Sequence, residues 1–393
     1  MDFNQSSRIL VACPDRMAHW LAEEIDELGY PCREVLRTGV MLDGTLNDCI
    51  RLNLHLRCAT HVRYSLGSFH AAHQDDIYRR VGRIPWEDII PEDGYFSVSN
   101  SADHFTLNNT MFLNMRVKDA VVDRFREQKG RRPDSGPLTD GIVIHVHWRD
   151  ERAEVFLETS GDTISRHGYR KLPGKAPMQE SLAAAVIRAT GWDRRSAWIN
   201  PMCGSGTLAI EAALLATGRK PGLLRDRYGF MNVLGYDPGF HIQEKEALNR
   251  IVNDSEVPLI LASDIRPEAL DAARENARLA GVESLIRWEC ADYRASAIPE
   301  PPGVVILNPE YGERMGEASA LSSVYSEIGD FFKQKCAGFT GFVFTGNLDL
   351  AKQIGLKPSR RIEFYSAQLD CRLLRYELYS GSRREPRPST AAD

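Results

Sequence analysis

One strand–turn–helix segment, residues 197–211, constrains the fold of this chain more than any other part of it. It reads Ala-Trp-Ile-Asn-Pro-Met-Cys-Gly-Ser-Gly-Thr-Leu-Ala-Ile-Glu. Its opening apolar run predicts a buried strand that breaks at Pro201, and an apolar helix begins at Thr207. Gly204 and Gly206 leave room for a ligand to approach the backbone, and the unpaired amides at the start of the helix face that ligand. The segment therefore predicts a binding turn at the carboxyl end of a strand.

The glycine spacing in this turn excludes two common phosphate-binding loops. A dinucleotide-binding turn would need a third glycine, and a P-loop would need a Gly-Lys-Ser/Thr ending. The turn alone does not identify its ligand, because a glycine-rich connection that binds nothing is about as common.

A second turn of the same kind follows about one hundred residues later, in residues 303–314. This segment reads Gly-Val-Val-Ile-Leu-Asn-Pro-Glu-Tyr-Gly-Glu-Arg, again an apolar run that ends in a polar turn. In an open parallel sheet, ligands bind beyond the carboxyl ends of the strands, where both turns are expected to lie. Asn308 offers an amide oxygen, Pro309 leaves its carbonyl free, and Tyr311 offers a flat face. Together these groups suit the exocyclic amine of a nucleobase.

The pair of turns resembles that of the S-adenosylmethionine-dependent methyltransferases that modify amino groups of nucleic acids, whose catalytic motif is Asp/Asn-Pro-Pro-Tyr/Phe/Trp. The resemblance implies that Asn308 and the Pro309 carbonyl hold the target amine and that Tyr311 stacks on a flipped base. Two residues depart from the family pattern. Glu310 replaces the second proline, and Asn200 stands where the family has aspartate.

The resemblance also implies a set of cofactor contacts at the strand ends. Asp264 is expected to accept from the ribose hydroxyls, or else to cap the following helix. Asp292 is expected to accept from the adenine amine, or else to be an ordinary turn residue. Glu180 is an expected contact too, with a simple helix-start carboxylate as the alternative. The full expected cofactor set is Glu180, Asn200, Pro201, Cys203, Gly204, Ser205, Gly206, Thr207, Asp264, Asp292 and Asn308.

The order of segments along the chain is similar to that of the bacterial THUMP-containing guanine-N2 methyltransferases of 23S ribosomal RNA, alone or as the first half of a fused enzyme. The predicted fold is α/β, with a Rossmann-like seven-stranded methyltransferase sheet after small α+β ferredoxin-like and THUMP domains. The predicted boundaries are 1–60 for the ferredoxin-like unit, 61–165 for the THUMP domain, 166–177 for a linker, 178–380 for the methyltransferase and 381–393 for a disordered tail.

RNA contact would require a local basic patch, because the net charge of the chain is −5. The candidate RNA contacts are Arg116, Lys118, Arg166, Tyr169, Arg170, Arg225 and Arg227. For Arg116 and Lys118 the alternative is a solvated helix face, and for Arg225 and Arg227 it is a solvated loop.

The remaining composition predicts a cytoplasmic protein with reduced thiols. The eight cysteines form no Cys-x-x-Cys pair, and the sequence shows no secretory leader and no apolar run of membrane-spanning length. The loose group His55, His61, His70 and His73 lacks other metal-ligating residues, so no metal is expected.

The predicted activity is transfer of a methyl group from S-adenosylmethionine to the exocyclic N2 of a guanosine, with 23S ribosomal RNA as the expected substrate. A tRNA substrate is one alternative. The other is an RNA-binding or ribosome-assembly protein whose catalysis has decayed, which the departures at Asn200 and Glu310 suggest. DNA adenine methylation shares the catalytic motif, but the RNA-type N-terminal modules argue against it.

Overall fold

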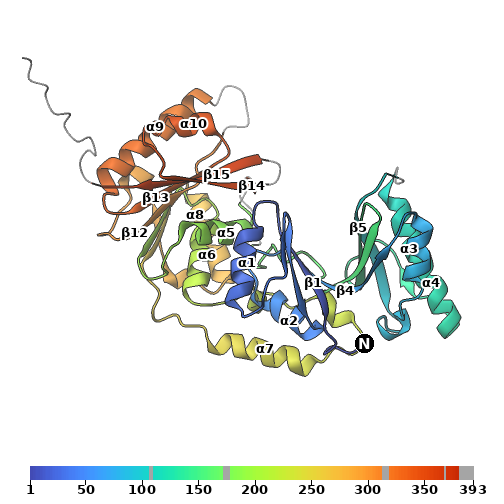
Figure 1. The fold of residues 1–393 in the computed structure, drawn as a ribbon. Helices are drawn as coiled ribbons and strands as arrows, with labels where there is room; N and C mark the ends of the chain where they lie inside the picture. Colours follow the sequence, from blue (N-terminus) through green and yellow to red (C-terminus); the bar gives the residue numbers. More distant parts are fainter. Residues whose placement is uncertain (106–108, 171–177, 312–317, 367–368, 380–393) are drawn as a thin grey trace, which may run out of the picture. The chain divides into compact units, whose positions relative to one another are not determined.

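The computed structural model describes residues 1–105, 109–170, 178–311, 318–366 and 369–379 (Figure 1). The described chain divides into two compact units. One contains the residues up to 170, 178–185 and 217–254, and the other contains 186–216 and those from 255 onward. The predicted tail, 381–393, and most of the predicted linker lie outside the described residues. Within the described ranges, no helix combines the length and the hydropathy that crossing a bilayer requires.

The first unit is built on one eight-stranded sheet in the order β2–β3–β1–β4–β8–β7–β5–β6. Its strands are β1 (Ser7–Ala12), β2 (Glu34–Leu36), β3 (Gly39–Gly44), β4 (His61–His70), β5 (Tyr95–Asp103), β6 (Asp134–Ser135), β7 (Ile142–Arg149) and β8 (Arg152–Glu158). Because β4 pairs with both β1 and β8, a single sheet runs through both predicted N-terminal modules. Gly67 and the nearby serines weaken the strand pattern of β4 at the point where its register against β8 shifts.

The helices of the first unit are α1 (Ala18–Glu27), α2 (Leu46–His55), α3 (Gln74–Val81), α4 (Thr110–Lys129) and α7 (Pro238–Arg250), with short 3-10 turns η1 (Trp86–Asp88), η2 (Pro221–Leu224) and η3 (Gly229–Asn232). Helix α4 is 20 residues long. Asn109 caps its start by accepting from the Met111 amide, and Gly130, with φ of 69°, ends it. Large apolar side chains in its first two turns face solvent, which hides the amphipathic period of the helix there.

The second unit contains the predicted seven-stranded sheet, in the order β11–β10–β9–β12–β13–β15–β14. Its strands are β9 (Ala197–Pro201), β10 (Ile260–Asp264), β11 (Ile286–Cys290), β12 (Gly303–Leu307), β13 (Thr340–Thr345), β14 (Arg360–Ser366) and β15 (Leu369–Glu377). Strand β15 is antiparallel to both of its neighbours. The predicted α/β class and the sheet are therefore confirmed.

Helices flank this sheet and complete its core. They are α6 (Thr207–Ala216), α8 (Pro267–Leu279), α9 (Ala318–Lys335) and α10 (Leu348–Lys352), with 3-10 turns η4 (Glu283–Leu285) and η5 (Tyr293–Ala295); α5 (Glu180–Thr190) begins in the first unit and ends in the second. Strands β10 and β12 are buried along their whole length, as expected for parallel strands covered on both faces. Because β10, β9 and β12 are adjacent and parallel, their carboxyl ends share one edge of the sheet.

Candidate functional site at the carboxyl edge of the sheet

The turn after β9 is held by backbone bonds and by two glycines that have different reasons to be glycine. The Cys203 amide donates to the Ser263 carbonyl over 2.9 Å, which ties the turn to β10. Gly204 has φ of 55°, and a Cβ there would meet nothing within 4 Å, so its backbone faces open space. At Gly206 a Cβ would lie 2.9 Å from Cβ of Ala273, so this glycine allows α8 to pack closely. Gly204 is the position at which a ligand can approach the backbone.

Asp264 is buried and fixes the glycine turn from the neighbouring strand. Its Oδ2 accepts from the Gly204 amide over 2.9 Å, and its Oδ1 accepts from the Arg266 amide over 3.0 Å. It is the last residue of β10. Oδ1 also accepts from Nε of Arg266 over 3.4 Å, whereas Oδ2 keeps a further acceptor site that a ribose hydroxyl can use.

Asn200 is almost fully buried, and its two amide atoms have different surroundings. Its Nδ2 donates to the Ile306 carbonyl over 3.1 Å, which joins β9 to β12. Its Oδ1 has no hydrogen-bond partner within the part of the chain that the structure describes. A buried acceptor without a partner is costly, and a bound donor can satisfy it. An ammonium group such as that of the methionine moiety fits this oxygen, and the open backbone at Gly204 fits the rest of the cofactor.

Replacing Asn200 with the family's aspartate is expected to lower the free energy of unfolding of the ligand-free protein by about 1–3 kcal/mol. A carboxylate cannot donate to the Ile306 carbonyl and would place two acceptors together. Urea denaturation at neutral pH measures the effect. Asn249→Asp on the exposed face of α7 is the control, and equal stability of the two variants would show that the Ile306 bond contributes nothing.

The turn after β12 brings Asn308 and Tyr311 together. The Tyr311 hydroxyl donates to Oδ1 of Asn308 over 2.6 Å, and Nδ2 of Asn347 donates to the Tyr311 carbonyl over 3.2 Å. Burial raises the pKa of the Tyr311 phenol, which therefore stays protonated and remains a donor. The second lone pair of the Asn308 oxygen is available to an incoming amine. The Tyr311 ring is half-buried beside Phe344, 6.5 Å between ring centroids, so it is packed inward in this structure.

Glu310, which replaces the family's second proline, lies near Arg266 at the carboxyl edge of the sheet. Its carboxylate lies 3.9 Å from Nη1 of Arg266, and Nε of Arg266 lies 3.4 Å from Oδ1 of Asp264. The guanidinium therefore lies between two carboxylates, one at the end of β10 and one on the turn after β12. Glu310 itself is mostly exposed, so this contact is weak without a ligand to cover it.

The other two expected acidic contacts are already engaged. Asp292 forms a bidentate pair with Arg294, whose Nε and Nη2 lie 2.9 and 2.6 Å from its oxygens. These hydrogen bonds hold the pKa of Asp292 below its usual value, so it is an ionised acceptor. Glu180 is buried in the first unit, with Oε1 3.6 Å from Nε of Arg170.

The candidate RNA contacts divide into exposed and engaged side chains. Tyr169 is buried, and Nη2 of Arg170 donates to the Met178 carbonyl over 2.6 Å. Arg225 likewise donates to the backbone carbonyls of Asp162, Thr163 and Arg166. Tyr169, Arg170 and Arg225 therefore stabilise the fold. Arg166 and Arg227 are exposed. Arg116 and Lys118 are partly exposed, and Nη2 of Arg116 donates to Oδ1 of Asp75 over 2.6 Å.

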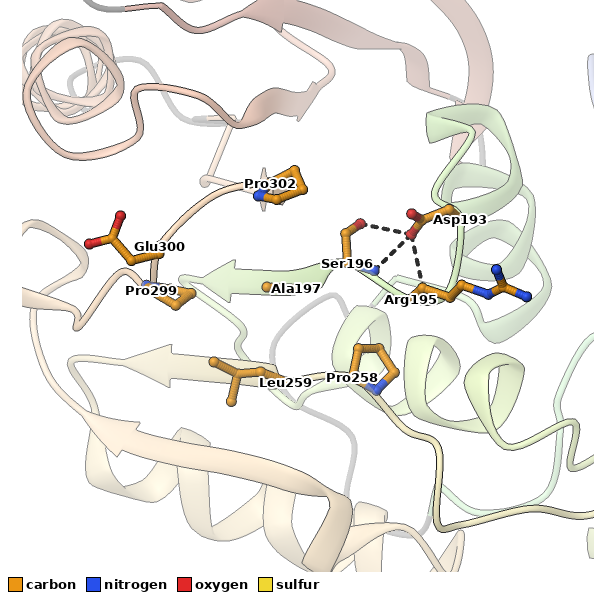
Figure 2. A pocket seen from close by; sticks show the side chains of 9 residues that line it. All are labelled: Asp193, Arg195, Ser196, Ala197, Pro258, Leu259, Pro299, Glu300 and Pro302. Carbon is orange, nitrogen blue, oxygen red and sulfur yellow. Dashed lines mark hydrogen bonds between the residues drawn. The ribbon is translucent and has the colours of Figure 1, made fainter.

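A pocket of about 480 Å³ lies at the opposite edge of the second unit's sheet (Figure 2). It is formed where β9, β10 and β12 begin, next to Ala197, Leu259 and Pro302. Figure 2 shows the Asp193 carboxylate bonded to the Ser196 hydroxyl and to backbone amides of its own turn. That carboxylate therefore stabilises a turn, and no residue predicted for the site lines this pocket.

Arg266, Arg294 and Asn347 were not predicted as residues of the site. For the two arginines, the sequence contains a pattern that could have indicated them. Arg266 and Arg294 each follow an expected cofactor carboxylate by two residues, so Asp-x-Arg occurs after both β10 and β11. In each case the arginine bonds that aspartate. Asn347 caps α10 and carries no signal of its contact with the turn after β12.

Three family models match this chain. A model described as an RMKL-like methyltransferase domain matches residues 167–375, an RlmL ferredoxin-like domain matches 8–63, and a THUMP domain matches 71–158.

Curated relatives and solved structures are similar over nearly the whole chain. A ribosomal RNA large subunit methyltransferase K/L of Syntrophotalea carbinolica is 35% identical over 94% of this chain and 53% of its own length. That of Methylococcus capsulatus is 36% identical over 93% of this chain and 50% of its own. The chain thus spans about half the length of these relatives.

Two solved structures share the fold closely. The crystal structure of SMU.472 complexed with SAH has a TM-score of 0.86 at 25% identity, over 98% of this chain and 100% of that one. A protein of Listeria monocytogenes, described as a predicted N6-adenine-specific DNA methylase, has a TM-score of 0.87 at 27% identity, over 95% and 96%.

Proposed function

The chain belongs to the RMKL-like methyltransferase family, which uses S-adenosylmethionine, and we propose that it methylates the exocyclic N2 of a guanosine in 23S ribosomal RNA. The relatives named as large subunit ribosomal RNA methyltransferases support ribosomal RNA as the substrate. The region matched by a THUMP model supports an RNA partner.

One observation carries the proposal. The turn that contains Asn308 follows β12, and the glycine turn follows β9, which is the neighbouring strand. Asn200 of β9 donates to the Ile306 carbonyl of β12 just before the two strands end. The Asn308 amide, which can accept from an amine, therefore lies beside a turn where Oδ1 of Asn200 is an unsatisfied acceptor and the backbone at Gly204 is open. That pairing suits transfer of a group onto an amine better than hydrolysis or redox chemistry.

The residues of the chain would act by orientation. The cofactor supplies a methyl group on a positively charged sulfur, which is a strong electrophile. Asn308 Oδ1 and the Pro309 carbonyl would accept from the amine and aim its nitrogen lone pair at the methyl carbon. When the nitrogen–carbon bond forms and the carbon–sulfur bond breaks, the amine releases one proton to water. Tyr311 would hold the Asn308 amide through its hydroxyl, so that the amide is oriented before the base arrives.

A labelled-methyl transfer assay tests the proposed substrate. The protein, radiolabelled S-adenosylmethionine and either protein-free 23S RNA or bulk tRNA are incubated, and label in the RNA is counted. Label in 23S RNA supports the proposal, and label in tRNA alone supports the alternative substrate. RNA binding without any transfer would favour the decayed RNA-binding protein.

Glu310 variants show whether the departure from the family motif has reduced activity. Glu310→Gln removes the charge beside Arg266 and is expected to change the transfer rate less than about threefold, because exposed ion pairs contribute little. Glu310→Pro restores the fixed backbone angle. If wild type is inactive and Glu310→Pro is active, Glu310 has silenced the enzyme, whereas equal rates in all three proteins would mean that the turn tolerates it.

A further inference from the structure

Four large apolar side chains are exposed within the region that the THUMP model matches. They are Phe105, Met111, Phe112 and Met115, exposed by 85, 68, 59 and 55%. We call these four residues the apolar ridge. Only residues 106–109 separate Phe105, just past the end of β5, from the start of α4, which carries the other three. Exposed apolar side chains gathered in this way commonly mark a binding surface.

Phe105 is the outermost ring of an aromatic column. Its ring centroid lies 4.5 Å from that of His104, and the His104 ring stacks on the fully buried Trp148 at 4.0 Å with an interplanar angle of 17°. Buried rings thus support Phe105 from beneath while most of its surface faces solvent. A supported, exposed ring is suited to stacking with another flat group.

The helical part of the ridge has cations beside it. Met111 and Met115 are four residues apart and share one face of α4, while Lys118 and Arg116 follow on its two sides. The Arg116 guanidinium is held in place by Asp75 at 2.6 Å and lies 4.4 Å from the centre of the Tyr78 ring. The Lys118 side chain is partly exposed.

We propose that the apolar ridge binds unpaired RNA nucleotides, with bases on Phe105 and Phe112 and phosphates beside Lys118 and Arg116. The inference rests on the proposed function, because it assumes an RNA substrate. Bases stack on aromatic rings only where they are not paired, so the surface selects loops, bulges or ends over duplex. The nearby cations complement a phosphate backbone and have no role at a purely apolar protein interface.

Fluorescence anisotropy with a labelled short oligouridine and a matched RNA duplex tests the ridge. Phe105→Ala and Phe112→Ala are each expected to weaken oligouridine binding roughly tenfold, and Phe112→Trp to retain it, because a base gains about 1–3 kcal/mol by stacking. Lys118→Ala should reduce the slope of log affinity against log salt by about one. Ile242→Ala, on α7 with an exposure of 57%, is the matched control and should bind as wild type.

Several outcomes would overturn the inference. Wild-type affinity in both phenylalanine variants would remove the ridge from RNA binding while leaving the proposed methylation intact. If wild type associates with itself in sedimentation and Phe112→Ala does not, the ridge joins two copies of the chain. If wild type binds neither oligouridine nor 23S RNA, the proposed function fails as well. Thermal melting and binding of S-adenosylmethionine should match wild type in every variant.

Discussion

Replacing Asn308 with alanine is expected to lower the rate of methyl transfer at least about a hundredfold, while the affinity for S-adenosylmethionine stays near that of wild type. The amide oxygen is the side-chain acceptor that the turn after β12 offers to an incoming amine, and Tyr311 holds it through a hydrogen bond of 2.6 Å. Without it, the nitrogen can still reach the site but is no longer aimed along the line of attack. The loss should therefore appear in kcat more than in KM.

Tyr311→Phe is the matched comparison, because it removes only the hydroxyl that orients Asn308. It should reduce kcat by roughly fivefold, since one neutral hydrogen bond contributes about 1 kcal/mol. Single-turnover rates at saturating cofactor separate this effect from binding. Transfer by Asn308→Ala at more than a tenth of the wild-type rate would mean that another group orients the amine.

Replacing Asp264 with asparagine is expected to weaken S-adenosylmethionine binding by roughly a hundredfold. Its carboxylate accepts from the Gly204 and Arg266 amides at 2.9 and 3.0 Å, and both bonds fix the turn that contacts the cofactor. An asparagine amide must turn a donor toward one of these N–H groups. Lost hydrogen bonds to a charged acceptor cost about 1.5–3 kcal/mol each, part of which appears as lost affinity and part as lost stability.

Isothermal titration with S-adenosylmethionine measures the affinity, and urea denaturation measures the stability. Asp271→Asn, an exposed aspartate on α8, is the control and should change neither quantity. The KM for the cofactor should rise in Asp264→Asn with a smaller change in kcat. Wild-type cofactor affinity in a folded Asp264→Asn protein would show that this carboxylate does not organise the site.

The sequence allowed the site's position to be predicted because strand order and turn chemistry are local properties. Two apolar runs, each followed by a polar turn, predict parallel strands whose carboxyl ends meet, and β9 and β12 are indeed neighbours. The helix after the glycine turn starts at Thr207, as predicted.

The partners of each side chain could not be predicted, because they depend on contacts between distant segments. Asn200 looked like a loss of charge, yet its amide donates to Ile306, more than one hundred residues away. Tyr311 looked like an open stacking face, but the structure packs it inward beside Phe344. The exposed start of α4 was hidden for a different reason, since apolar residues on a solvent face remove the helical period. The assignment of roles at the site, and the domain boundaries given above, remain predictions.

The identity of the methylated nucleoside tests the central claim most directly. After transfer from labelled S-adenosylmethionine to unmodified 23S RNA, the RNA is digested to nucleosides and separated by liquid chromatography with mass detection. The account predicts label in N2-methylguanosine, absent when Asn308→Ala replaces wild type. Label in N6-methyladenosine, or in any methylated nucleoside other than N2-methylguanosine, would contradict it.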